Sequence, residues 1–186
     1  MKKLSALMIT AAFVGFASAG YAADDSTTTQ GSVDYKKNGG YDASRSSEQT
    51  LPDGSKKTSE TTINKDVDSN GLATKKVTTE TKVTPPGTVN GLLNQKKDVS
   101  TSEVKEKDRG GSDRTDTQKH TDPNGTNVTV KTSVNKDVDK NGNVTETVKS
   151  QQTVDPQGLM NAKTTETKTK TVNGAVVEES KQAPQQ

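Results

Sequence analysis

Apolar and polar residues alternate along most of this chain. Between residues 33 and 99, 13 apolar residues fall at odd positions and two at even positions; between residues 104 and 177, 12 fall at even positions and three at odd positions. Alternation with a period of two is typical of β-strands with one apolar and one polar face. The polar positions are rich in Thr, which is β-branched and favours an extended backbone. The pattern therefore predicts long, largely polar β-strands.

Short turn signals separate these segments, most of them at intervals of about 13 residues. Pro52-Asp53-Gly54, Pro123-Asn124-Gly125 and Lys140-Asn141-Gly142 each suit a three-residue hairpin loop, a type I turn followed by a glycine with positive φ. This loop length fixes the register of the flanking strands, because a slip of one residue would invert the faces. The cross-strand pairs that it predicts on one face are Val67–Ala73, Ile63–Val77, Val138–Val144, Val134–Val148 and Val128–Val154.

The same loop rule extends the apolar face beyond residue 156. A loop at Pro156-Gln157-Gly158 predicts that Val154 lies opposite Met160. It also places charged residues on the apolar face, which dilute its hydrophobic character: Lys136, Glu146, Glu166, Lys168 and Lys170. Such a face fits either a single-layer sheet held by Thr pairs and Lys–Glu ladders or two sheets packed loosely as a sandwich.

The chain contains a tandem duplication. Residues 39–85 align without a gap on residues 110–156, at an offset of 71, and 19 of these 47 positions are identical. The longest match joins residues 64–71 to residues 135–142, and the motif Gly39-Gly40-x-Asp42 recurs as Gly110-Gly111-x-Asp113. Repeats of this kind each contribute one supersecondary unit to the fold.

These observations predict an all-β fold, an antiparallel β-meander built from two tandem repeats of about 71 residues. We place the first repeat at residues 33–103 and the second at 104–177, after a flexible segment at 23–32 and before a disordered C-terminal tail at 178–186. The alternative is a largely disordered chain. Beyond residue 22 only 23 of 164 residues are Leu, Ile, Val or Phe, a share below the roughly 20% at which disorder is the default.

Residues 1–22 have the pattern of a secretory signal peptide. Lys2 and Lys3 precede an apolar stretch from Leu4 to Ala19, and Gly20 and Ala22 provide small residues before a cleavage site. The stretch of 16 residues is short of the roughly 20 that span a membrane, so we expect no membrane span. After cleavage of the signal peptide, we expect the protein to be in the periplasm of a bacterium, or secreted or at the cell surface.

Two six-residue segments resemble the first half of an EF-hand or dockerin-type calcium loop. They are Asp66-x-Asp68-x-Asn70-Gly71 and Asp137-x-Asp139-x-Asn141-Gly142, with oxygen ligands at the first, third and fifth positions. The resemblance implies calcium as a ligand of these six residues. It ends at the twelfth position, where a closing Glu is replaced by Val77 or Val148. The alternative interpretation is a hairpin turn, in which the Asn-Gly pair is present for its backbone conformation.

The rest of the sequence contains no clear catalytic or nucleic-acid-binding motif. His120 is the single histidine, there is no cysteine, and no Gly-x-Ser-x-Gly motif occurs, so we expect no enzyme activity and no cofactor other than calcium. Lysine pairs are dispersed, and the charge beyond residue 22 is balanced, which argues against nucleic-acid binding. Three functions remain open: an exported structural or interaction protein with an unknown protein or envelope partner or self-association through sheet edges, a calcium-responsive binding module, or a disordered envelope stress protein.

Overall fold

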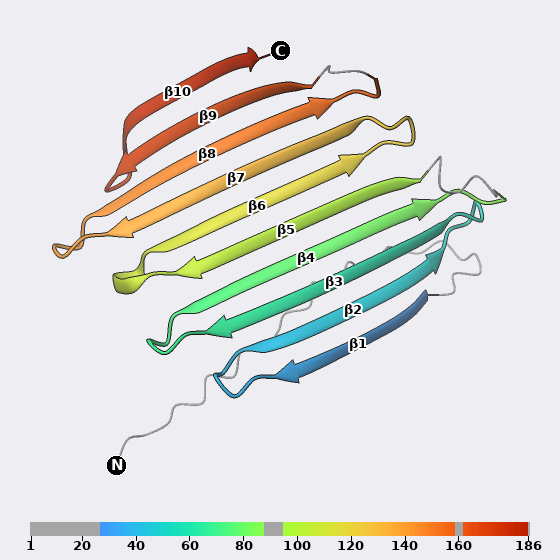
Figure 1. Cartoon of the computed structure of the whole chain (residues 1–186), viewed down its shortest axis with the longest axis horizontal. Coiled ribbons are helices and arrows are strands. Elements are labelled where there is room, and N and C mark those ends of the chain that lie inside the picture. The colour runs from blue at the N-terminus through green and yellow to red at the C-terminus, as the bar shows by residue number, and fades with distance from the viewer. Residues whose placement is uncertain (1–26, 88–94, 159–161, 186) are drawn as a thin grey trace.

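We describe a computed structural model of the chain, in which residues 27–87, 95–158 and 162–185 are placed. Ten antiparallel strands form one open sheet in which each strand pairs with its neighbours in sequence (Figure 1). This confirms the all-β antiparallel meander. In chain order the strands are β1 (Thr27–Tyr35), β2 (Tyr41–Thr50), β3 (Lys56–Val67), β4 (Ala73–Thr84), β5 (Lys96–Glu106), β6 (Ser112–Thr121), β7 (Asn127–Val138), β8 (Val144–Asp155), β9 (Lys163–Val172) and β10 (Ala175–Gln185).

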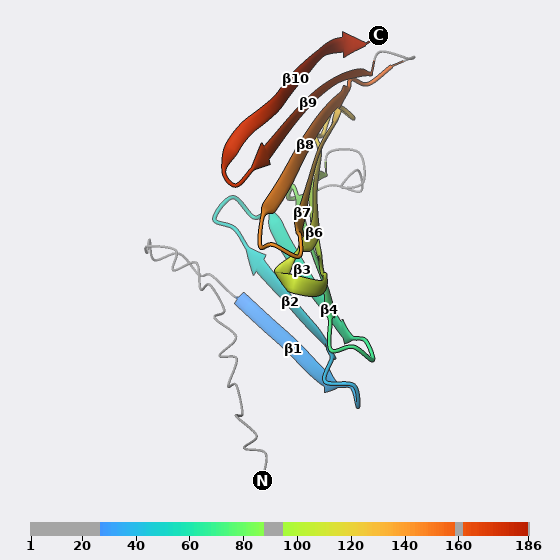
Figure 2. The ribbon, with the colours of Figure 1, turned by 90° about the vertical axis from the view of Figure 1, so that its left-hand side faces the viewer.

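The sheet is a single twisted layer, seen nearly edge-on in Figure 2. Among the described residues no hydrophobic side chain is buried, and Ser55 is the one polar side chain that is. Of the two arrangements that the sequence left open, the structure therefore has the single layer and not the sandwich. Within the same residues no helix has the length and apolar character needed to cross a membrane.

The duplication is visible in the strand boundaries. Adding 71 to the bounds of β2, β3 and β4 gives the bounds of β6, β7 and β8. The hairpin loops match as well, since Asp68 N donates to Leu72 O at 3.0 Å and Asp139 N donates to Asn143 O at 3.0 Å. Each loop closes on a glycine with positive φ, +83° at Gly71 and +82° at Gly142. The two copies therefore fold in the same way, and β5 joins them into one sheet.

The register predicted from the loop length is confirmed at the five pairs before residue 156. Val138 lies opposite Val144, Val134 opposite Val148 and Val128 opposite Val154 in the second copy; Val67 lies opposite Ala73 and Ile63 opposite Val77 in the first. We call the face that carries these pairs the valine face, and the opposite one the polar face. Hydroxyl pairs such as Thr61–Thr79, with 3.1 Å between their oxygens, add to the valine face.

The prediction beyond residue 156 is wrong. Val154 lies opposite Lys163, and Met160 is outside the described residues. The connection after β8 is therefore longer than a three-residue loop, and the change of parity exchanges the two faces of β9. Lys168 lies opposite Lys149, so Glu166, Lys168 and Lys170 are on the polar face.

The sheet also extends further at both ends than the repeat boundaries drawn from the sequence. β1 begins at Thr27, inside the segment 23–32 expected to be flexible, and β10 continues to Gln185, inside the tail 178–186 expected to be disordered. All nine residues of β1 are exposed. Residues 27–32 contain no apolar residue, so the alternation of apolar and polar positions could not indicate this part of the strand. Residues 1–26, including the predicted signal peptide, lie outside the described residues.

Candidate functional site

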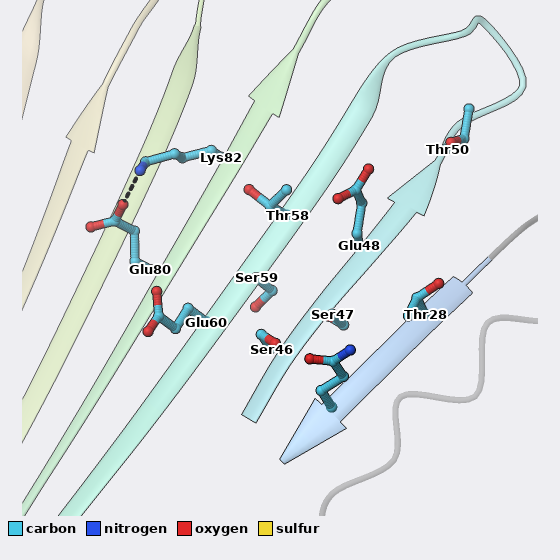
Figure 3. Close-up of a pocket in the computed structure, with 11 residues that line it drawn as sticks. Thr28, Ser46, Ser47, Glu48, Thr50, Thr58, Ser59, Glu60, Glu80 and Lys82 are labelled. Carbon is cyan, nitrogen blue, oxygen red and sulfur yellow. Dashed lines mark ion pairs between the residues drawn. The ribbon is translucent and has the colours of Figure 1, made fainter. Parts of the chain in front are cut away.

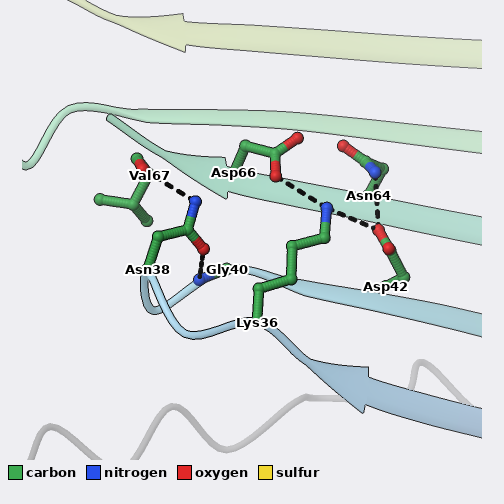
Figure 4. Close-up of polar contacts among 7 residues, drawn as sticks. All are labelled: Lys36, Asn38, Gly40, Asp42, Asn64, Asp66 and Val67. Carbon is green, nitrogen blue, oxygen red and sulfur yellow. Dashed lines mark hydrogen bonds and ion pairs between the residues drawn. The ribbon is translucent and has the colours of Figure 1, made fainter. Parts of the chain in front are cut away.

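A lysine bound by two aspartates lies on the polar face at the end of the first three strands (Figure 4). Lys36 follows β1, and its Nζ lies 3.0 Å from Asp42 Oδ1 on β2 and 2.7 Å from Asp66 Oδ1 on β3. Asn64 Nδ2 donates to the same Asp42 oxygen at 2.6 Å. These contacts raise the pKa of the Lys36 ammonium above its usual value, chiefly through its hydrogen bond to Asp66. The cluster links three strands through one charged side chain.

The second repeat contains the same cluster, with every member displaced by 71 residues. Lys107 Nζ lies 2.8 Å from Asp113 Oδ1 and 2.9 Å from Asp137 Oδ1, and Asn135 Nδ2 donates to Asp113 Oδ1 at 2.7 Å. Hydrogen bonding from Lys107 holds the pKa of Asp113 below its usual value. We call these two groups the lysine clamps: Lys36, Asp42, Asn64 and Asp66 in the first, and Lys107, Asp113, Asn135 and Asp137 in the second.

Each lysine clamp depends on a glycine that lets its turn approach the neighbouring strand. A Cβ atom on Gly40 would lie 2.1 Å from Lys65 O, and one on Gly111 would lie 2.8 Å from Lys136 O. In the first copy Asn38 also ties the turn to β3, since Asn38 Nδ2 donates to Val67 O at 3.0 Å. The recurring Gly-Gly-x-Asp motif therefore marks a close backbone approach.

The aspartates predicted to bind calcium have two different sets of contacts in the structure. Asp66 and Asp137 lie on strands, where each binds the lysine of its clamp. Asp68 and Asp139 are in the hairpin loops, where their Oδ1 atoms accept backbone N–H groups: from Asn70 at 2.8 Å and Leu72 at 2.9 Å in the first copy, and from Asn141 and Asn143, both at 2.8 Å, in the second.

The side chain of Asn143 also donates to Asp139 Oδ2 at 2.8 Å. This bond and the backbone bonds of the loop lower the pKa of Asp139 below its usual value. The two predicted asparagine ligands contribute backbone N–H groups: Asn70 donates to Asp68 and Asn141 donates to Asp139. Among the described residues no three His, Asp or Glu side chains are placed to hold a metal together. The geometry is that of a capped hairpin loop, and calcium binding stays a prediction.

A shallow hollow lies on the polar face over β1 to β4 (Figure 3). Its lining is mostly Ser, Thr and Glu side chains, with Glu60 directly opposite Glu80 on the next strand. Lys82 and Lys97 lie 2.6 Å and 3.0 Å from Glu80, and their hydrogen bonds lower its pKa. This carboxyl group is therefore kept ionised, which does not suit the role of a general acid.

His120 lies on the valine face between two carboxylates. Its Nδ1 contacts Asp98 on β5, and its Nε2 lies 3.0 Å from Asp122 Oδ1. The hydrogen bonds to Asp98 and then Asp122 raise the pKa of the imidazole above its usual value. With both ring nitrogens facing carboxylates, the arrangement favours the doubly protonated ring, which has no lone pair to act as a base. On the neighbouring strand β7, Val128 lies opposite His120.

Comparison with family models, with curated proteins and with solved structures finds no match to this chain. The sequence analysis singled out the loop aspartates, as calcium ligands, and the Gly-Gly-x-Asp motif, as part of the repeat, but missed the lysine clamps. The signal was present, because Lys36 and Lys107 are identical residues at the same offset of 71. They lie three positions before the aligned segment begins, next to positions that differ between the copies.

Proposed function

We propose that this chain is an exported, non-enzymatic repeat protein with a structural or interaction role in the bacterial periplasm or at the cell surface. The observation that carries this proposal is the single-layer sheet without a buried hydrophobic side chain among the described residues. Among the described residues this sheet has two broad faces and two edge strands with one partner each, β1 and β10, which are available for contact with other macromolecules. The hollow over β1 to β4 is an open trough lined by hydroxyl and charged groups, unlike the concave, mostly apolar sites that bind small substrates.

The lysine clamps support the structural part of the proposal. Each clamp ties one turn to the second strand beyond it, and the two clamps recur at the same end of the sheet. An extended sheet gains little from a core, so such cross-strand ties, together with the backbone ladder, hold neighbouring strands in register. The charged residues of the clamps are thus accounted for by the fold.

Export is the part of the proposal that a single experiment addresses. The full chain, tagged at its C-terminus, is expressed in a Gram-negative host, and the recovered protein is examined by cell fractionation and by mass spectrometry of its N-terminus. We expect periplasmic or secreted protein that begins at Ala23. A matched variant with Val14→Asp in the apolar stretch should stay unprocessed in the cytoplasm. Unprocessed cytoplasmic wild-type protein would contradict the proposal.

A further inference from the structure

The edge strand β1 is unusually open to pairing with another strand. In the described part of the chain it pairs only with β2, and all nine of its residues are exposed. The bond from Lys36 N to Gly40 O, 2.9 Å, fixes the alternation of the antiparallel ladder. Even-numbered residues of β1 therefore exchange hydrogen bonds with β2. The outward N–H and C=O groups belong to Thr27, Thr29, Gly31, Val33 and Tyr35.

The opposite edge, β10, is protected in ways that β1 is not. Its register shifts between Val176 and Glu178 and again between Gln182 and Gln185. It also contains Pro184, which has no N–H to donate, and Lys181. Bulges, proline and lysine are the devices by which natural edge strands avoid pairing with other chains. β1 contains neither proline nor lysine, and Asp34 is its one charged residue.

The sequence of β1 is complementary to itself in the antiparallel direction. Gly31 is the midpoint of Thr27–Tyr35, so two copies paired about Gly31 overlap along all nine residues. In this register Val33 lies opposite Thr29 of the second copy and Tyr35 lies opposite Thr27. Asp34 lies opposite Thr28 of the second copy, so no like charges face each other.

We propose that β1 is a self-association edge, at which two copies of this chain pair their β1 strands antiparallel about Gly31. This inference rests on the interaction role proposed above and names the partner, a second copy. Five outward-facing residues on each strand would form about ten main-chain hydrogen bonds, two for each hydrogen-bonded pair. Val33 and Tyr35, now 54% and 80% exposed, would gain cross-strand neighbours. Because the β10 edge is interrupted, association stops at a closed two-fold dimer.

Sedimentation equilibrium of the purified protein, in the form recovered from its host, tests the dimer. We expect a monomer–dimer equilibrium at micromolar concentrations, shifted at least tenfold toward monomer by Val33→Pro. This proline removes an outward N–H and leaves the bonds from β1 to β2 in place. The control is Val177→Thr on the opposite edge, which should leave the dimer unchanged. A monomeric wild type, or polymers larger than a dimer, would overturn the proposal.

The register is tested separately with disulfides, because the chain contains no cysteine. Gln30 would lie opposite Ser32 of the second copy in a non-hydrogen-bonded pair, with Cα atoms about 4.5 Å apart, within reach of a disulfide. An equimolar mixture of Gln30→Cys and Ser32→Cys should cross-link several-fold faster than either variant alone. Equal rates would overturn the register even if Val33→Pro failed to fold. If the dimer or its register is overturned, the proposed export of the chain still stands or falls by cell fractionation and mass spectrometry of its N-terminus.

Discussion

Lys107 Nζ lies 2.9 Å from Asp137 Oδ1, although 30 residues and the whole of β6 separate the two along the chain. The ammonium of Lys107 also lies 2.8 Å from Asp113, so it binds one carboxylate on each of two neighbouring strands. Its pKa is raised above the usual value by the hydrogen bonds to Asp113 and Asp137. One cation thereby links β6 and β7 to the turn that precedes them.

Replacement of this cation should weaken the sheet by a modest, measurable amount. Lys107→Met keeps an unbranched side chain of similar size but leaves Asp113 and Asp137 without their shared partner. Because the group is partly open to solvent, we expect a loss of about 0.5–1 kcal/mol in the free energy of unfolding, measured in urea at low salt. Lys131→Met is the matched control, since Lys131 is an exposed lysine on the same face without an ion pair among the described residues. Equal effects of the two variants would show that the lysine clamp contributes nothing.

Two glycines should respond differently to the same substitution. Gly40→Ala places a Cβ atom 2.1 Å from Lys65 O, so the backbone must move, and we expect a loss of about 3 kcal/mol. Gly142→Ala meets open space but retains a φ of +82°, which costs about 1–2 kcal/mol for a residue with a Cβ atom. Urea denaturation of both variants measures the difference. If Gly40→Ala were the milder change, the close approach of the turn to β3 would be wrong.

The loop aspartates allow the hairpin-turn interpretation to be separated from calcium binding. Asp68→Asn with Asp139→Asn removes two charges but keeps a side-chain oxygen that can accept the loop N–H groups. We expect this double variant to unfold at a slightly lower urea concentration than the wild type, because Asn143 Nδ2 loses its acceptor, Asp139 Oδ2. Asp68→Ala with Asp139→Ala should unfold at a clearly lower concentration, because the loop N–H groups lose their acceptors.

The same variants are then compared with and without millimolar calcium. If the carboxylates serve only the loops, calcium leaves the unfolding transition of the wild type in place. A rise in wild-type stability with calcium that both double variants abolish would instead establish the resemblance to calcium loops as functional.

His120 predicts a pH dependence with a definite sign. Its folded-state pKa is raised by Asp98 and Asp122, so its contribution to stability is fully present below its unfolded pKa of about 6.5. That contribution is lost as the pH rises through the higher folded-state value. Solvent screening keeps the effect small, below about 1 kcal/mol. The free energy of unfolding should therefore fall from pH 6 to pH 8 in the wild type and stay flatter in His120→Gln; identical profiles would contradict this assignment.

The sequence predicted the features of this fold that depend on neighbours along the chain. The pairing of Val138 with Val144 follows from a three-residue loop, and the alternation of valines then defines a face. The pairing of Val154 was predicted wrongly, because Pro156-Gln157-Gly158 fits a three-residue loop whereas the actual connection continues to Lys163. The contact of Lys36 with Asp66 was hidden for a different reason. It spans an intervening strand, and no periodic pattern encodes such a contact.

The pairing of β4 with β5 joins the two repeats into one continuous sheet, because β5 corresponds to β1 at the offset of 71 residues. The bonds from Asp68 N to Leu72 O and from Lys107 N to Gly111 O place Thr78 on β4 and Thr101 on β5 in a non-hydrogen-bonded pair, where Cα atoms are about 4.5 Å apart. Nuclear Overhauser spectroscopy of the purified protein should therefore show a strong contact between the Hα protons of these two residues. Its absence would contradict the continuous sheet: the repeats would be separate if the corresponding contacts within each repeat remained, and the chain would be disordered if those were missing as well.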